Sequence, residues 1–172
     1  MSISDLNMDN NLELLTVVEP YNPPYNEGST LTSHSFIGSN IEFNFQKELV
    51  NLYGLNPAPP AVGNLLGDKK LEFVVSTPNS FNVFDANGNK LWDSASSIGV
   101  MPATLEDVIL TDLDNDGLNE IIGGIKDNAF GFIMMGNGIA IFKYNGSYFD
   151  YYSGWPILRE KSIFSGILVA DL

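Results

Sequence analysis

The chain has 172 residues, of which 44% are hydrophobic, and this is enough to bury a core and argues against a disordered protein. Its 21 acidic and 8 basic residues give a formal net charge of −13, which argues against nucleic acid and anionic membranes as main partners, since both require clustered lysine and arginine. The chain has no cysteine, so disulfide frameworks and thiolate metal or redox sites are excluded.

Neither a membrane-spanning segment nor an export signal is visible in the sequence. No apolar run approaches the roughly 18 residues that a membrane helix needs. Residues 1–5 lack the basic flank and apolar stretch of a signal peptide and already belong to a repeated motif. We therefore expect no membrane insertion, and we interpret the chain as a segment of a longer protein.

Four stretches of the chain share one pattern, an apolar run, a loop rich in Asp, Asn and Gly, and a second apolar run that begins near a glutamate. They are residues 2–18, 60–76, 108–125 and, in truncated form, 166–172. The first loop positions lie 59, 48 and 59 residues apart, at Asp5, Asn64, Asp112 and Asp171. Repeats of roughly 40 to 60 residues built from short strands indicate β-propeller blades.

Two further strands are predicted in each unit from alternation and turn chemistry. They are 41–45 and 49–53 in the first unit, 81–84 and the strand starting at 90 in the second, and 139–142 and 148–152 in the third. No segment has a helical period over ten or more residues. The predicted fold is therefore all-β, with about three four-stranded blades, in units 1–59, 60–106 and 107–165, and the start of a further blade at 166–172.

Three blades do not close a ring, and an open array would leave long exposed edges. We therefore expect these blades to belong to a larger ring of seven or eight. The missing blades would come from the same chain or from other subunits.

The segment DLDNDGLNE, residues 112–120, has the composition of a calcium-binding loop. Asp112, Asp114 and Asp116 alternate, and Gly117 follows where a tight turn needs a positive φ. Calcium takes six to eight oxygen ligands, and a short acidic loop can supply several of them. An EF-hand is excluded because its twelfth position, which must be a bidentate Glu, is Gly123 here.

The chain resembles the FG-GAP/VCBS repeat family, whose propellers include the heads of integrin alpha subunits. The resemblance rests on DLDNDGLNEII at Asp112, DLNMDNNLELL at Asp5, and the degenerate NLLGDKKLEFV at Asn64. In that family the loop joins the two innermost strands of a blade and holds Ca²⁺. The resemblance implies two ligand sets, the first being Asp112, Asp114, Asp116, the Leu118 carbonyl and Glu120, and the second Asp5, Asn7, Asp9, the Asn11 carbonyl and Glu13.

The three loops differ in the ligands that they offer. Asn7 replaces a carboxylate in the first loop, and Asn10 stands where glycine is expected, so we expect weaker binding there. Leu66 cannot ligate, and Lys69 and Lys70 add positive charge, so we expect no metal at Asn64. If metal binds, we expect a structural role, because a self-contained loop leaves no open position for catalysis.

The other chemistry-bearing residues point to binding rather than catalysis. His34, the single histidine, is interpreted as a surface loop residue, and Trp92 and Trp155 as packing between blades. Long loops on the face opposite the acidic loops carry candidate ligand-binding aromatics, namely Tyr21, Tyr25, Phe130 and Phe132.

These features favour a non-catalytic, calcium-stabilised adhesion or binding propeller, extracellular or on the cell surface, that recognises a protein or a carbohydrate. Millimolar calcium outside cells would fill even a weak loop. Two alternatives remain open at this stage. One is the propeller of a calcium-dependent polysaccharide lyase, and the other is a structural segment of a surface filament or assembly.

Overall fold

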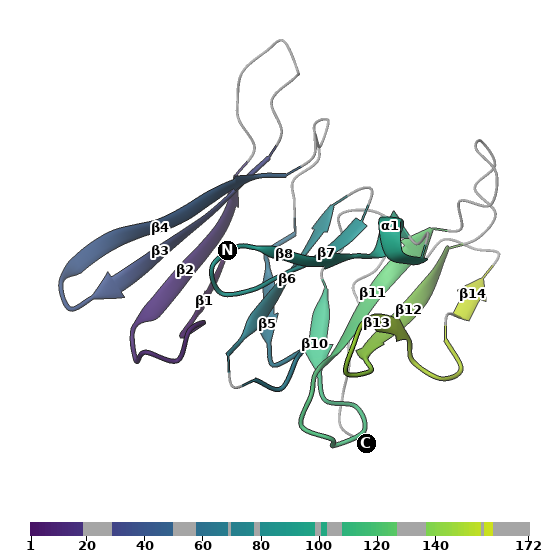
Figure 1. Cartoon of the computed structure of the whole chain (residues 1–172). Coiled ribbons are helices and arrows are strands. Elements are labelled where there is room, and N and C mark those ends of the chain that lie inside the picture. The colour runs from purple at the N-terminus through teal and green to yellow at the C-terminus, as the bar shows by residue number, and fades with distance from the viewer. Residues whose placement is uncertain are drawn as a thin grey trace, which may run out of the picture.

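The computed structural model describes residues 1–18, 29–49, 58–68, 70–77, 80–98, 101–102, 108–126, 137–155 and 157–159. Over these residues the fold is all-β, as predicted, with one five-residue helix, α1 (Ser94–Ile98) (Figure 1). No helix within the described ranges is long and apolar enough to cross a membrane.

Three antiparallel sheets follow one another along the chain. The first has the order β1 (Ser2–Ser4), β2 (Leu12–Val18), β3 (Thr30–Ile37), β4 (Asn40–Glu48). The second has the order β5 (Ala61–Gly63), β6 (Glu72–Thr77), β7 (Ser80–Phe84), β8 (Lys90–Asp93). The third has the order β10 (Ile109–Thr111), β11 (Glu120–Lys126), β12 (Asn137–Tyr144), β13 (Phe149–Tyr151), and the short strands β9 (Met101–Pro102) and β14 (Ile157–Arg159) pair with β11 and β12.

The second sheet lies between the other two, so both of its faces are covered (Figure 1). Every residue of β6 and β7 is buried, whereas β3 of the first sheet alternates between buried and half-buried residues. Strands buried on both faces have near-continuous apolar sequences, and this explains the run Phe73-Val74-Val75. The three sheets thus stack face to face in chain order.

Aromatic side chains fill the two spaces between the sheets. Between the first and second sheets, Phe73 is stacked on Phe45 and on Phe84, with ring centroids 6.2 and 5.3 Å apart. Between the second and third sheets, Trp92 contacts Phe142 and Phe149 at centroid distances of 5.6 and 5.2 Å. The prediction that Trp92 packs between neighbouring units is therefore confirmed.

The sheets stack in the same sense, because equivalent residues face the preceding sheet. The residue after the glutamate that begins the second strand of a sheet is Phe73 in the second sheet and Ile121 in the third, and each belongs to the core shared with the preceding sheet. The equivalent Leu14 pairs with Ile3 on the opposite face of the first sheet. On this outer face, Ile3, Ile41 and Phe43 are 57%, 65% and 60% exposed.

The strand prediction for the first unit is right in part. The expected strand 41–45 lies within β4, which is the fourth strand of the sheet and not the third. The expected strand 49–53 lies, from residue 50 on, outside the described residues. The third strand is β3, which was not predicted and forms a hairpin with β4 around a turn at Gly38, whose φ is 61°. His34 therefore lies half-buried on β3, with an edge contact to Phe43 at 5.6 Å, and not in a surface loop. Serine, threonine and histidine obscured this strand, because its buried positions include the small polar residues Ser33 and Ser35.

Candidate metal centre

Three corresponding loops join the first two strands of the sheets, and we call them loop I (residues 5–13), loop II (residues 64–72) and loop III (residues 112–120). In loop III the Asp112 carboxylate accepts hydrogen bonds from the backbone amides of Asp116 and Gly117, at 3.1 and 2.9 Å. Asn115 and Gly117 have φ values of 59° and 91°, so the positive φ predicted for Gly117 is confirmed. The chain thereby curls round its own first carboxylate.

Loop I has the same conformation. Asp5 accepts hydrogen bonds from the amides of Asp9 and Asn10, at 3.0 and 2.9 Å, as Asp112 does from its own loop. Asn10 has a φ of 70° in place of glycine, a conformation that asparagine tolerates better than most residues. Asn7 donates its side-chain amide to Asp9 at 3.0 Å, so this loop satisfies part of its own charge.

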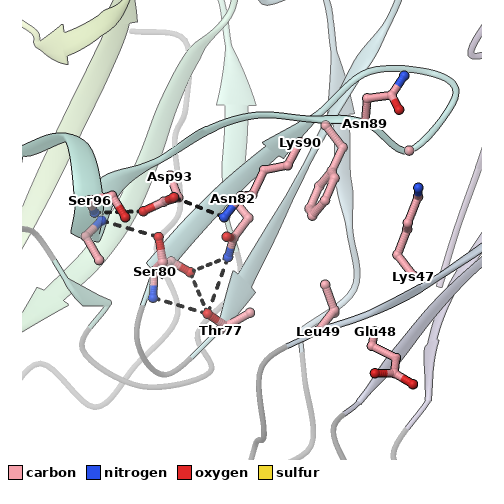
Figure 2. Close-up of a pocket in the computed structure, with 13 residues that line it drawn as sticks. Lys47, Glu48, Leu49, Thr77, Ser80, Asn82, Asn89, Lys90, Asp93 and Ser96 are labelled. Carbon is pink, nitrogen blue, oxygen red and sulfur yellow. Dashed lines mark hydrogen bonds and ion pairs between the residues drawn. The ribbon is translucent and has the colours of Figure 1, made fainter.

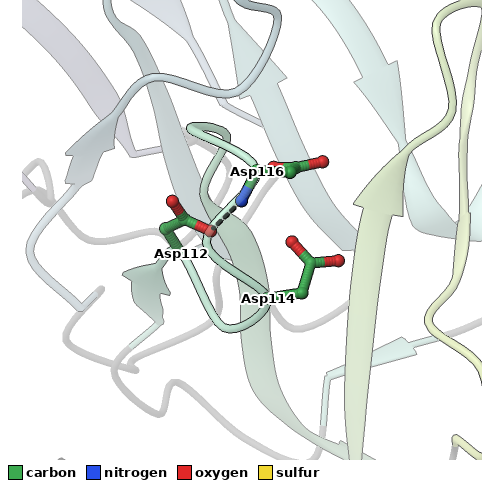
Figure 3. A group of neighbouring side chains, drawn as sticks. All are labelled: Asp112, Asp114 and Asp116. Atoms are coloured by element: carbon green, nitrogen blue, oxygen red, sulfur yellow. Dashed lines mark hydrogen bonds between the residues drawn. The ribbon is translucent and has the colours of Figure 1, made fainter.

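Loop III brings Asp112, Asp114 and Asp116 together, with ligand oxygens that all lie within 4.8 Å of one another (Figure 3). Calcium binds oxygen at 2.3–2.6 Å, so two ligands of one ion are at most about 5 Å apart. The three carboxylates therefore fit a single calcium ion. Asp112 and Asp116 keep free lone pairs for such an ion, because each carboxylate offers about four acceptor sites.

The glutamate that begins the second strand is buried in all three sheets and binds the loop backbone. Glu13, Glu72 and Glu120 are 2%, 2% and 0% exposed. Each accepts a hydrogen bond from the backbone amide of the second residue of its loop. The donors are Leu6, Leu65 and Leu113, at 2.8, 2.9 and 2.7 Å. One oxygen of each glutamate therefore fixes the loop to the strand, whichever cation is present.

The second oxygens of the two predicted ligands Glu13 and Glu120 have different surroundings. In loop I, Glu13 Oε1 accepts a hydrogen bond from the Ser35 hydroxyl at 2.9 Å, so both of its oxygens are engaged within the protein. In loop III, Glu120 Oε1 is buried without a hydrogen-bond partner. An unpaired buried oxygen is costly, and it is an available ligand for a cation.

Lys143 of β12 extends into loop III and is not among the predicted site residues. Its Nζ is paired with Asp114 and lies 2.7 Å from Asp116 Oδ2 and 3.7 Å from Glu120 Oε1. Tyr152 lies beside them, with its ring centroid 5.9 Å from the ammonium and its hydroxyl 3.5 Å from Asp114. The strand register identifies this residue: β11 and β12 pair Ile121 with Phe142, and this brings Lys143 opposite Glu120.

The charges in this group shift one another's pKa values. Burial raises the pKa of Glu120, and the charges of Asp114 and Asp116 raise it further. The hydrogen bond from Lys143 lowers the pKa of Asp116, and the hydrogen bonds to Asp114 and Asp116 raise the pKa of Lys143. Asp116 and Lys143 therefore stay charged at neutral pH.

Loop II, where no metal is predicted, is bound to loop III by three hydrogen bonds. The amide of Asn64 donates to Asn119 Oδ1 at 2.8 Å, the amide of Asn119 donates to the Asn64 carbonyl at 2.7 Å, and Asn64 Nδ2 donates to the Gly117 carbonyl at 2.8 Å. A similar backbone bond joins Leu71 to Leu6 of loop I at 3.0 Å. The conformation of each loop is therefore coupled to its neighbour.

The remaining predicted site residues are less informative. Leu118 is half-buried and donates its amide to Asp116 at 2.9 Å, and the amide of Asn11 donates to Asp9 at 2.8 Å. The candidate ligand-binding aromatics lie outside the described residues: Tyr21, Tyr25, Phe130 and Phe132.

A cavity of about 650 Å³ separates β4 from β7, β8 and α1 (Figure 2). Its polar groups largely bind one another: Thr77 Oγ1 donates to the Ser80 carbonyl at 3.0 Å, and Asn82 Nδ2 donates to the same carbonyl at 3.1 Å. On its rim Lys90 pairs with Asp93 at 3.1 Å. Since these contacts hold two strands together, loop III remains the stronger candidate site.

No family model matches the chain, and no curated protein and no solved structure match it either.

Proposed function

We propose that this chain is part of a calcium-stabilised, non-catalytic binding propeller of the FG-GAP/VCBS type, which recognises a protein or a carbohydrate outside the cell. One observation carries the metal part of the proposal, the convergence of the carboxylates of Asp112, Asp114 and Asp116 within 4.8 Å. A site made of carboxylate and carbonyl oxygens, without histidine or cysteine, suits a hard cation such as calcium better than zinc or copper.

In the proposed site, Asp112, Asp114 and Asp116 hold the ion together with the Leu118 carbonyl, and Glu120 offers its unpartnered oxygen. Bound calcium would supply the positive charge that offsets these acidic groups. The residues themselves are partly pre-organised, because Asp112 and Asp116 already bind backbone amides of the loop. A pre-organised loop loses less conformational entropy when it binds its ion.

The propeller part of the proposal is supported by the way the sheets repeat. Each of the second and third sheets packs one face on the preceding sheet, with aromatic and aliphatic side chains between them. The equivalent face of the first sheet exposes Ile3, Ile41 and Phe43. A further unit of the same kind would cover this apolar face, in a ring of seven or eight blades completed by the same chain or by other subunits.

An extracellular or cell-surface setting is proposed from charge and from calcium supply. The formal net charge of −13 makes cation binding favourable, since bound calcium reduces self-repulsion. Extracellular modules work with calcium affinities of about 10⁻⁴–10⁻³ M, so a loop of modest affinity is filled there. A glycan array and a panel of candidate cell-surface proteins, each probed with and without chelator, would identify the ligand class.

The metal proposal is tested by Asp114→Ala. The variant should lose calcium binding in calorimetry, because one of three carboxylates is removed, and calcium should raise its melting temperature less than it raises that of the wild type. Asp68→Ala in loop II is the matched control and should behave as the wild type, since Leu66 gives that loop no oxygen at the corresponding position. Wild-type melting curves that are identical with calcium and with chelator would refute the proposal.

A further inference from the structure

Lys143 supplies loop III with a cation of the chain's own. Its side chain is 26% exposed, and its ammonium contacts Asp114, Asp116 and Glu120, three of the residues proposed to hold calcium. The contacts come from a neighbouring strand, β12, so the ammonium enters the loop from outside its own backbone. The acidic group is therefore compensated before any metal ion arrives.

The same position differs in the other two sheets. It is the residue that the strand register brings opposite the buried glutamate. It is Ser35 in the first sheet, Asp85, the residue after β7, in the second, and Lys143 in the third. Ser35 satisfies Glu13 with a neutral hydroxyl at 2.9 Å. Within the described residues, the third sheet alone places a positive charge there, beside the loop with three aspartates.

Glu120 shows that the ammonium does not satisfy the site completely. Its Oε1 is fully buried and lacks a hydrogen-bond partner, and Lys143 Nζ lies 3.7 Å away, beyond hydrogen-bonding distance. A buried carboxylate oxygen left in this state is available to a cation that can bind more oxygens at once. An ammonium has three donors, whereas calcium takes six to eight oxygens.

We propose that Lys143 is a tethered competitor of the divalent cation: it occupies the carboxylate group of loop III in the metal-free protein and must withdraw when calcium binds. An ammonium has no lone pair and cannot join the coordination shell, and two cations in one small site repel each other. The inference rests on the proposed function, and it adds that Lys143 sets the calcium concentration at which the loop fills. The measured affinity is reduced by the fraction of molecules in which the ammonium still occupies the site.

Calorimetric titration with calcium chloride after chelator treatment tests this inference on the wild type and on Lys143→Met. The methionine variant should bind calcium at least about fivefold more tightly, the lower end of typical coupling between two ligands of one site. Its metal-free melting temperature should at the same time fall, because the ammonium no longer compensates Asp114 and Asp116. Lys90→Met removes one charge from an ion pair remote from loop III and should leave the calcium affinity unchanged.

Lys143→Arg keeps the test decisive if the methionine variant does not fold. A guanidinium binds carboxylates in a bidentate fork, so arginine should compete more strongly and weaken calcium binding relative to the wild type. The inference would be overturned if Lys143→Met bound calcium no more tightly than the wild type, or if Lys143→Arg bound it at least as tightly as the wild type. Calcium binding by the wild type would still support the proposed function in that case. Absence of calcium binding by the wild type and by Lys143→Met would overturn the proposed function itself.

Discussion

Replacement of Glu72 by alanine should lower the free energy of unfolding by about 3 kcal/mol, because the buried Leu65 amide and the half-buried Leu66 amide lose their acceptor. Glu72 Oε2 accepts hydrogen bonds from Leu65 at 2.9 Å and from Leu66 at 3.1 Å, and no metal is expected in this loop. An unsatisfied buried donor costs about 1–3 kcal/mol, so the two amides together would cost about 2–6 kcal/mol. Removal of a buried carboxylate offsets part of this cost, which places the expected value at the lower half of the range.

Glu72→Gln keeps the hydrogen-bond acceptor and removes the negative charge, so it separates the two effects. The amide oxygen still accepts the two hydrogen bonds, so this variant should lie within about 1 kcal/mol of the wild type at neutral pH. Burial raises the pKa of Glu72 above its ordinary value of 4.5. The folded protein then holds this proton more tightly than the unfolded chain, so the stability that the group contributes is present below pH 4.5 and is lost as the pH rises through the folded pKa. The stability of Glu72→Gln relative to the wild type should therefore increase over that interval.

Urea unfolding followed by tryptophan fluorescence measures both effects, since Trp92 is buried between the second and third sheets. A loss of 3 kcal/mol corresponds to a drop of about 6–12 °C in melting temperature for a chain of this length. Glu42→Ala, which removes an exposed glutamate from β4, is the control and should change little. If Glu72→Ala were no less stable than Glu42→Ala, or if Glu72→Gln were as unstable as Glu72→Ala, the reasoning would be refuted.

Two further substitutions test the contacts between units. Gly123→Ala would place a Cβ 2.6 Å from Phe81 Cε1 and closer still to Cζ, so it should destabilise the fold by about 1–3 kcal/mol in urea unfolding. The double variant with Phe81→Leu should recover part of the loss, and full stability of the single variant would contradict the close packing. Asn119→Ala removes the acceptor of the Asn64 amide and should cost about 1 kcal/mol, whereas Asn87→Ala, in an exposed turn, should cost nothing measurable; equal effects of the two asparagine variants would argue against the link between loops II and III.

Much of the strand pattern was predictable because it depends on neighbouring residues in the sequence. The turn at Asn145–Gly146 forms, with φ of 92° at Gly146, and the Asp85 turn closes through a hydrogen bond from Gly88 at 2.9 Å. Both lie where Asn-Gly pairs separate alternating apolar runs. In the first unit the third strand, β3, was not predicted, because it buries the small polar residues Ser33 and Ser35.

Those two serines are buried because tertiary contacts satisfy them. Asn44 of β4 donates to Ser33 at 3.1 Å and to Ser35 at 2.8 Å, and Ser35 in turn binds Glu13. Such a network depends on residues from three strands, so no local period in the sequence reveals it. Two apolar residues of the predicted strand 41–45, Ile41 and Phe43, lie on the exposed outer face.

The acidic loop was likewise predictable in part. The alternating positions of Asp112, Asp114 and Asp116 predicted that these residues lie together, and the glycine at position 117 predicted a positive φ there. The partner from β12 was not predicted, because finding Lys143 requires the pairing register as well as the motif. The double role of Glu120 was also missed, since one of its oxygens binds the Leu113 amide and only the other remains available.

A crystal structure of the chain grown with millimolar calcium chloride would test the metal site most directly. We expect a density peak enclosed by Asp112, Asp114 and Asp116, within 2.3–2.6 Å of their oxygens, with the Lys143 ammonium withdrawn from these carboxylates. Well-ordered density that shows the ammonium still between Asp114 and Asp116, and no ion in the loop, would contradict it.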